Sequence, residues 1–303
     1  MTPRAFVDVG SNSVRCFLPD HDPPIRTTRV IGLRRGAGPD GSLARDALAR
    51  LDQCLGDIAT AVVGIDPIHR VAFATSAVRD APNRGAACDL VRQRLGTRLH
   101  ILTGTTEARL AFRGAYSGLG LAEGAVVIDP GGGSTELVAG DLSGVLAGVS
   151  LQLGAVRDTE HFLHSDPPTA IEVRRLRTHA RELLTQAAGD IGWNSEQRPT
   201  VVGVAGTITT LASIVQGGYD PLRVHNAVLT ASSVTRISHL LARLPAARRA
   251  ELPGLHPDRA PVIVAGAVIV DEALAVLRAD RLIVSEYDIL DGAAADPAVV
   301  SGS

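Results

Sequence analysis

The sequence predicts an α/β fold made of two halves, each with a mixed β-sheet and flanking helices. Three observations support this class. Strand-like apolar segments alternate with helical repeats of three and four, the 303 residues suffice for two domains, and the 45% hydrophobic content is aliphatic, with 3% aromatic residues. Similar strand–turn–strand segments at 6–18 and 126–139 open the two halves. We therefore expect an N-terminal lobe over residues 1–120 and a C-terminal lobe over residues 121–303.

The N-terminal half is expected to begin with a β-hairpin and to continue with alternating helices and strands. Apolar residues spaced three and four apart from Leu43 to Val62 form one stripe, which predicts a helix. The Pro-rich residues 19–24 and the Gly-rich residues 32–38 interrupt regular structure. The remaining elements are a strand at 71–74, a helix at 84–95 that ends at Gly96, a strand at 99–102 and a helix from about Thr106.

The C-terminal half is expected to repeat this alternation after a second hairpin. Helices are expected at 157–163, 170–188, 207–216, 231–243 and 261–277, and strands at 201–204 and 282–284. Arg174, Arg175 and Arg177 are expected to cover an exposed helix face. The tail after Gly292 is rich in small residues and is expected to be frayed. The halves share no sequence repeat strong enough to establish a duplication.

Composition excludes several classes of function. All 30 basic residues are arginine, which excludes a Walker A loop and a Schiff-base mechanism because both need lysine. The net charge of -2 gives no general attraction for nucleic acid, so no such partner is expected. Cys16, Cys54 and Cys88 are odd in number, widely spaced and without a Cys-x-x-Cys pair, so neither a disulfide framework nor a zinc site is indicated. No signal peptide or membrane-spanning stretch is seen, so we expect a cytoplasmic protein without a membrane partner.

Two glycine- and hydroxyl-rich turns are the candidate phosphate-binding elements. Each follows an apolar strand that ends in an aspartate, and each returns into apolar sequence, which predicts a hairpin tip. Glycine lets backbone amides converge on an oxyanion, and hydroxyls add donors. We expect both turns to face one polyphosphorylated ligand. The candidate residues are Gly10, Ser11, Asn12, Ser13 and Arg15 in the first turn, and Gly131, Gly132, Gly133 and Ser134 in the second.

Carboxylates beside these donors predict a divalent cation. Asp8, Asp129 and Glu136 would repel phosphate unless a hard cation lay between them. We therefore expect these three residues to be ligands of Mg²⁺ or Mn²⁺.

Two further segments place polar residues just after predicted strands. Ser76 and Arg79 follow the strand at 71–74, where open α/β sheets place their ligand-binding loops, so both are candidates for phosphate binding. Gly206 and Thr207 follow the strand at 201–204 and open a helix, whose N-terminus could favour an anion. For Thr207 alone, an ordinary N-cap is the favoured interpretation.

Glu107 is the candidate catalytic carboxylate. It lies in the first turn of a predicted helix, after the N-cap candidates Thr105 and Thr106. Its position is typical of a residue that interacts with the helix dipole, and it could instead be a general base that deprotonates water. The pattern by itself favours the dipole interpretation.

Together these motifs resemble the exopolyphosphatase and guanosine-pentaphosphate phosphohydrolase family, which belongs to the superfamily of actin, heat-shock chaperones and sugar kinases. The resemblance covers nearly the whole chain. It implies two actin-like (ribonuclease H-like) lobes with the active site in the cleft between them, and it implies that the helical domain of longer family members is absent. Besides the two turns, it rests on residues 74–79, 107–114, 153–157, 204–207, 252–255 and 284–286.

The resemblance implies a metal-dependent exopolyphosphatase that releases orthophosphate from the end of inorganic polyphosphate. Glu107 would be its catalytic carboxylate, Arg79 would face the phosphate, and a homodimer is expected. The family usually has two adjacent glutamates where this chain has Thr106 and Glu107, which leaves Glu107 as the sole candidate base. The alternatives are a guanosine pentaphosphate (pppGpp) 5′-phosphohydrolase of the stringent response, a non-hydrolysing sensor of polyphosphate or nucleotide, and a kinase-like user of ATP.

Overall fold

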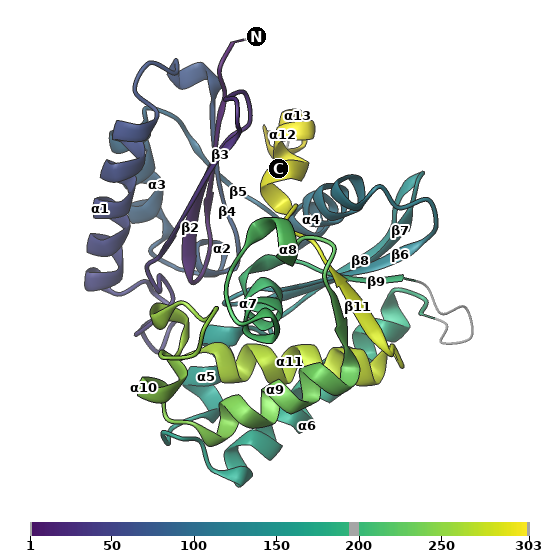
Figure 1. Cartoon of the computed structure of the whole chain (residues 1–303). Coiled ribbons are helices and arrows are strands. Elements are labelled where there is room, and N and C mark those ends of the chain that lie inside the picture. Colours follow the sequence, from purple (N-terminus) through teal and green to yellow (C-terminus); the bar gives the residue numbers. More distant parts are fainter. Residues whose placement is uncertain (1, 194–199, 302–303) are drawn as a thin grey trace. The chain divides into compact units, whose positions relative to one another are not determined.

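The chain forms two compact units, each built around one β-sheet (Figure 1). The structure, a computed structural model, describes residues 2–193 and 200–301. Unit 1 consists of Met1–Glu107 and Gly292–Ser303, and unit 2 of Ala108–Asp291. The α/β class is confirmed. The lobe boundary at 120/121 stays a prediction, and these units differ from it in grouping the last residues of the chain with the N-terminal part.

Unit 1 contains a five-stranded mixed sheet in the order β3-β2-β1-β4-β5. The expected hairpin is confirmed: β1 and β2 pair antiparallel, while β4 joins β1 in parallel and β5 joins β4 in parallel. The third strand was not predicted, because most of its residues are exposed and its sequence lacks apolar alternation. The strands are β1 (Ala5–Val9), β2 (Ser13–Leu18), β3 (Ile25–Val30), β4 (Arg70–Ala74) and β5 (Leu99–Ile101).

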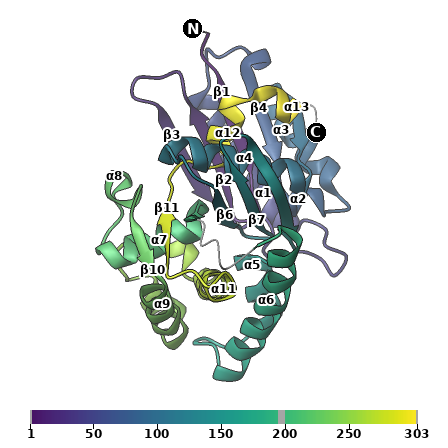
Figure 2. The same ribbon diagram turned by 90° about the vertical axis from the view of Figure 1, so that its right-hand side faces the viewer.

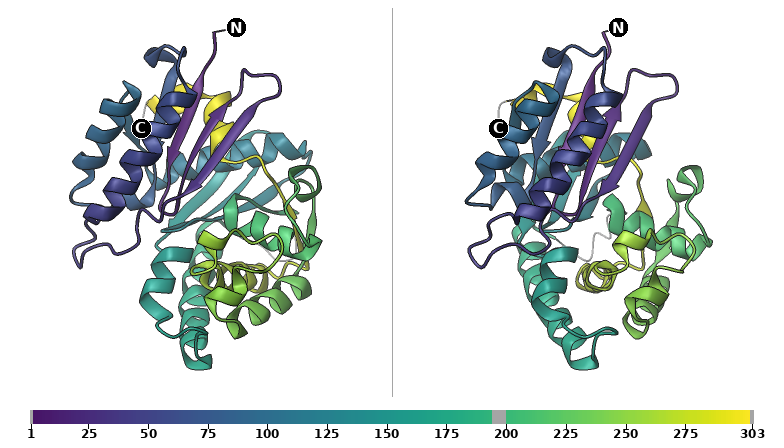
Figure 3. Two further views of the ribbon diagram at one scale, coloured as in Figure 1. Left: turned by 60° about the vertical axis from the view of Figure 1, so that its left-hand side comes forward. Right: turned by 90° about the vertical axis from the view of Figure 1, so that its left-hand side faces the viewer.

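Two long helices of unit 1 pack on each other and on one face of this sheet (Figure 3). Leu51 and Leu55 are fully buried there, with Val7 and Val9 of β1 in the same core. Gly96 ends α3 in a left-handed conformation, as expected. The helical segments are α1 (Arg45–Ala61), the short 3₁₀ helix Pro67–His69, α2 (Ser76–Arg79), α3 (Arg84–Leu95) and the start of α4 (Gly104–Leu119).

The C-terminal tail is helical as far as it is described, to Ser301, so the expectation that it is frayed is wrong for these residues. It forms α12 (Ile289–Ala295) and α13 (Pro297–Ser301). Ala293 and Val300 are fully buried, α13 packs on β4, and Arg4 donates to the carbonyl oxygen of Ala294 at 3.2 Å. Small side chains let these short helices pack closely, and burial of their apolar area holds the tail in place.

Unit 2 contains a six-stranded sheet in the order β10-β11-β9-β6-β7-β8. As in unit 1, an antiparallel hairpin carries a third antiparallel strand on one side and two parallel neighbours on the other. This shared topology relates the two units in a way that the sequence could not establish. The strands are β6 (Ala125–Pro130), β7 (Thr135–Asp141), β8 (Gly144–Leu151), β9 (Thr200–Gly203), β10 (Val228–Thr230) and β11 (Arg281–Val284); β8 and β10 were not predicted.

An almost wholly buried helix, α11, forms the centre of unit 2 and contacts α5, α6, α7 and α9 (Figure 2). Its buried Glu272 accepts hydrogen bonds from Arg177 at 2.7 Å and from Arg181 at 2.8 Å. Arg177 therefore does not cover an exposed face as expected, because it neutralises a carboxylate in the core. The helices are α5 (Ala155–Phe162), α6 (Ala170–Asp190), α7 (Ala205–Gln216), α8 (Pro221–Val224), α9 (Ala231–Arg243), α10 (Ala246–Arg249), the 3₁₀ helix Pro257–Arg259 and α11 (Ile263–Val276).

The cysteines are free, and within the two described ranges no helix has the length and apolar character needed to cross a membrane. Burial raises the pKa of the Cys16 thiol, and of the Cys54 thiol, to about 11. Both thiols are therefore protonated and unreactive at neutral pH.

Candidate active site

The first loop, residues Gly10–Ser13, closes the β1–β2 hairpin of unit 1. The amide of Gly10 donates to the carbonyl oxygen of Ser13 at 3.0 Å. The carbonyl of Ser11 accepts from the Arg34 amide at 2.9 Å, and that of Asn12 accepts from two amides at 2.8 and 2.9 Å. The segment after β3 therefore holds the carbonyls of this loop on one side.

The second loop, residues Gly131–Ser134, closes the β6–β7 hairpin of unit 2 in the same way. The amide of Gly131 donates to the carbonyl oxygen of Ser134 at 2.9 Å. The carbonyls of Gly131 and Gly132 accept from amides of the first turn of α5 at 2.8 to 3.0 Å. Each unit thus has a hairpin tip whose carbonyls are bound by the segment that follows its third strand.

Several amides of the two loops have no hydrogen-bond partner within residues 2–193 and 200–301. They belong to Ser11 and Asn12 in the first loop, and to Gly132, Gly133 and Ser134 in the second. Clustered backbone donors of this kind form a concave site for an anion. The loops therefore have the chemistry expected of phosphate-binding elements, although their ligand stays a prediction, as does the expectation that one ligand meets both.

The strand positions next to the two loops carry different charges. In unit 1, Asp8 lies opposite Arg15 across the hairpin, and the arginine donates to its carboxylate at 2.5 and 3.0 Å. In unit 2, Asp129 occupies the equivalent place, and the residue opposite it is Glu136. Asp8 thus has an internal counter-ion, so its predicted role as a metal ligand gains no support from this geometry.

Asp129 and Glu136 form a cross-strand pair of carboxylates that are 7% and 1% exposed. Like charges directly opposite each other in a sheet are destabilising, and a cation between them would remove that repulsion. Ser150 donates to Glu136 at 2.6 Å and orients it. The described residues contain no cluster of three or more histidine, cysteine or acidic side chains that could hold a metal. Two carboxylates fit Mg²⁺, which is usually bound by one or two of them together with substrate phosphates.

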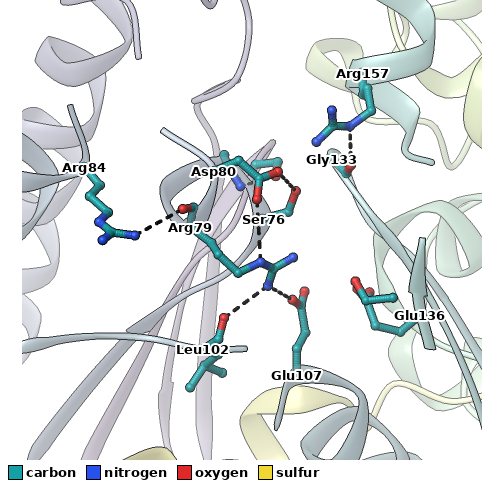
Figure 4. A network of polar contacts seen from close by, with 12 residues as sticks. Ser76, Arg79, Asp80, Arg84, Leu102, Glu107, Gly133, Glu136 and Arg157 are labelled. Carbon is teal, nitrogen blue, oxygen red and sulfur yellow. Dashed lines mark hydrogen bonds and ion pairs between the residues drawn. The ribbon is translucent and has the colours of Figure 1, made fainter. Parts of the chain in front are cut away.

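Arg79 and Glu107 form an ion pair in unit 1 (Figure 4). Arg79 ends α2, and its guanidinium donates to Glu107 at 2.7 Å and to the carbonyl oxygen of Leu102 at 3.1 Å. Glu107 lies in the first turn of α4. The backbone amide of Thr106 donates to the hydroxyl of Thr103 at 3.1 Å, so the capping side chain is Thr103 and not the expected Thr105 or Thr106. Arg79 thereby holds the carboxylate in a fixed position, with 9% of the glutamate side chain exposed.

The first loop is joined to the same region of unit 1. β1 and β4 run parallel, so the first loop and α2 both follow strand ends at one edge of the sheet. The hydroxyl of Ser11 accepts a hydrogen bond from the amide of Ala77 at 3.2 Å. Ser76 is fully buried and donates to Asp80 at 3.4 Å, so its hydroxyl supports α2. Unit 1 thus brings together nine of the predicted residues: Asp8, Gly10, Ser11, Asn12, Ser13, Arg15, Ser76, Arg79 and Glu107.

Gly206 and Thr207 lie beside the second loop of unit 2, inside α7. The helix begins at Ala205, so Thr207 is not its N-cap; its hydroxyl donates to the carbonyl oxygen of Pro130 at 3.1 Å. Sequence reasoning missed Arg259, whose guanidinium lies within 2.3 Å of where a Cβ on Gly206 would be. A larger residue at position 206 would therefore require the flexible Arg259 side chain to move. The predicted residues grouped in unit 2 are Asp129, Gly131, Gly132, Gly133, Ser134, Glu136, Gly206 and Thr207.

A buried carboxylate lies behind the second loop. Asp158 of α5 is 1% exposed, and the amide of Gly154 donates to it at 2.5 Å. Burial raises the pKa of Asp158 above its usual range, although the Gly154 amide and the nearby His179 lower it in part. Gly154 lies in the turn that precedes α5, and this turn packs closely on the second loop. A Cβ on Gly154 would lie 2.6 Å from the carbonyl oxygen of Gly132.

Comparisons with known proteins identify the relatives of this chain. The model of the Ppx/GppA phosphatase family matches residues 22–296. The chain is 38% identical over 317 residues to exopolyphosphatase 2 of Mycobacterium tuberculosis, covering 97% of this chain and 98% of that protein. It is 30% identical to exopolyphosphatase 1 of Mycobacterium leprae, covering 94% and 86%.

Solved structures show the same fold. The crystal structure of an exopolyphosphatase-like protein superposes with a TM-score of 0.89 at 31% identity, covering 97% of this chain and 98% of that one. That of the Aquifex aeolicus member of the Ppx/GppA family superposes with a TM-score of 0.77 at 28% identity, covering 100% and 99%.

Proposed function

The chain belongs to the Ppx/GppA phosphatase family, and from this premise we propose that it is an exopolyphosphatase, which hydrolyses the terminal phosphoanhydride bond of inorganic polyphosphate. Relatives named exopolyphosphatase, similar along almost their whole length, support this substrate. The observation that carries the proposal is the pair of hairpin tips, each of which has backbone amides without a hydrogen-bond partner among the residues that the structure describes. Such donors bind phosphate oxygens without reading a base or a sugar, which suits a chain of identical phosphoryl units.

Glu107 is proposed as the general base. A water molecule beside its carboxylate would lose a proton to Glu107 as its oxygen attacks the terminal phosphorus. The bond from that phosphorus to the bridging oxygen would then break, which releases orthophosphate and a chain shorter by one unit. Phosphoryl transfer depends mainly on positioning and electrostatic stabilisation, so this reaction needs no covalent nucleophile. Arg79 fixes the orientation of Glu107 through the contact of 2.7 Å.

Asp129 and Glu136 are proposed to hold Mg²⁺ or Mn²⁺ beside the second loop. A bound divalent ion would offset the negative charge of the phosphate chain. In the protein itself, Ser150 orients Glu136, and the hairpin register keeps the two carboxylates opposite each other. We also propose that the protein is a cytoplasmic homodimer. Gel filtration with light scattering would measure its number of subunits.

A substrate panel tests the proposed function. The purified chain is assayed for orthophosphate release from long polyphosphate, tripolyphosphate, guanosine pentaphosphate and ATP, each with Mg²⁺. The highest kcat/KM is expected for polyphosphate. A preference for guanosine pentaphosphate would instead establish the 5′-phosphohydrolase, preference for ATP would establish an ATP-using enzyme, and tight binding of polyphosphate without release would establish a sensor.

A further inference from the structure

The start of α5 binds three successive carbonyls of the second loop. The Ala155 amide donates to Gly131 at 2.9 Å, and the next two amides donate to Gly132 at 2.8 and 3.0 Å. The Nε of Arg157 donates to the carbonyl oxygen of Gly133 at 2.7 Å (Figure 4). Of these four hydrogen bonds, the last is the one that uses a side chain.

These contacts fix the direction of the amides of the second loop. In a planar trans peptide, the carbonyl of one residue and the amide of the next point in opposite directions. Holding the carbonyls of Gly131, Gly132 and Gly133 on the α5 side therefore turns the three following amides away from α5. They are the amides of Gly132, Gly133 and Ser134, which have no partner within the described ranges.

The two earlier carbonyls are held by backbone amides, which almost any residue of α5 could supply. The carbonyl of Gly133, and with it the amide of Ser134, depends on the side chain at position 157. We propose that Arg157 is a positioning residue, which directs the Ser134 amide of the second loop toward the phosphate chain. This inference rests on the proposed function for its ligand, but the orientation of the loop can be measured without one.

The turn that precedes α5 has further hydrogen bonds that do not use the Arg157 side chain. The amide of Gly154 is held by Asp158 at 2.5 Å, and the hydroxyl of Thr159 donates to the carbonyl oxygen of Ala155 at 2.7 Å. The backbone amides of α5 keep their own contacts with the second loop. Substitutions of Arg157 are therefore expected to leave the fold intact.

Three substitutions separate the hydrogen bond from the charge. Arg157→Gln places its Nε2 at the same number of bonds from the backbone as the arginine Nε, so it keeps a donor without a charge. Arg157→Met has a similar length and no donor. Arg157→Lys keeps the positive charge but places its donor nitrogen one bond further from the backbone than the arginine Nε. We expect KM for tripolyphosphate to rise about tenfold in the methionine variant, with a smaller change in kcat, because one hydrogen bond to the loop is lost. The glutamine variant should stay within about twofold of the wild type.

Backbone ¹⁵N relaxation of the ligand-free protein provides a second readout. The Ser134 amide should be as ordered in the glutamine variant as in the wild type, and more mobile in the methionine variant, at unchanged melting temperature. The inference is overturned if the Ser134 amide stays as ordered in the methionine variant as in the wild type. It is also overturned if the lysine variant has the wild-type KM and the glutamine variant does not, because the charge of Arg157 would then act on the substrate. Failure of the wild type to hydrolyse polyphosphate would refute the proposed function alone, since the relaxation data still decide the role of Arg157.

Discussion

Substitution of Gly154 by alanine should displace the second loop without unfolding the protein. Gly154 has extended backbone angles that any residue adopts, so the added methyl group brings no backbone strain. Its Cβ would, however, lie 2.6 Å from the carbonyl oxygen of Gly132 and 2.6 Å from the carbonyl carbon of Gly133. Both are backbone atoms of the second loop, so they cannot move aside as a flexible side chain would.

The size of the effect follows from these contacts. Restoring an ordinary separation of 3.4 Å from the 2.6 Å contact requires the loop and the turn to separate by 0.8 Å. A shift of this size would stretch the hydrogen bonds between α5 and the loop. Overpacking of this kind costs about 1 to 3 kcal/mol of unfolding free energy. Displacement of positioning groups by about 1 Å costs on the order of 100-fold in rate. We therefore expect kcat/KM for polyphosphate to fall about 30- to 100-fold.

The assay measures orthophosphate release over a range of polyphosphate concentrations, together with urea unfolding of each variant. Gly189→Ala is the matched control, because Gly189 lies near the end of α6 in the same unit and a Cβ there would meet nothing within 4 Å. This control should keep its activity and gain up to about 1 kcal/mol, since alanine is the better helix former. If Gly154→Ala keeps the wild-type kcat/KM, the turn at Gly154 does not set the geometry of the second loop.

Three substitutions and one chelation experiment test other groups of the site and of the fold. Glu107→Gln should lower kcat about 10²- to 10⁴-fold while polyphosphate binding persists. The control Glu123→Gln, at an exposed position, should leave kcat unchanged. Full activity without the Glu107 carboxylate would remove this residue from the mechanism. Chelation of divalent ions with EDTA should stop phosphate release, and added Mg²⁺ should restore it; activity that persists would contradict the proposed metal. Glu272→Gln should lower the urea unfolding free energy by about 1 to 3 kcal/mol, because the buried carboxylate that pairs with Arg177 and Arg181 loses its charge, although Arg177 keeps its ion pair with Asp271 at 2.7 Å. The exposed Glu182→Gln should change it by less than about 0.5 kcal/mol. Hydrogen bonds, of which the one from the Thr169 amide has the largest effect, lower the pKa of Glu172 from 4.5 to about 2. The stabilisation by its carboxylate is therefore complete above pH 4.5 and is lost as the pH falls toward 2. The unfolding free energies of the wild type and of Glu172→Gln, measured across this range, should become equal at the acid end.

The local elements of the fold follow from short-range sequence patterns. The helices at 84–95 and 231–243 have the bounds that periodicity and end signals predicted. Both hairpins and their glycine-rich tips were also predictable, because turn residues flanked by apolar strands specify a hairpin through short-range geometry. The opposition of Asp129 and Glu136 follows from the register that such a short turn imposes.

Tertiary structure alone decided which distant groups meet. Arg177 neutralises Glu272 across 95 residues of sequence, Arg79 fixes Glu107 across 28, and Arg157 binds the carbonyl of Gly133 across 24. The tail after Gly292 is ordered by the same kind of contact, since its short helices gain stability from burial and not from their own propensity. Periodicity reports which face of an element is apolar, but it does not identify the surface that covers that face. The two glycine-rich loops are therefore specified by the local sequence, while the side chains that orient them are determined only by the packing of the chain.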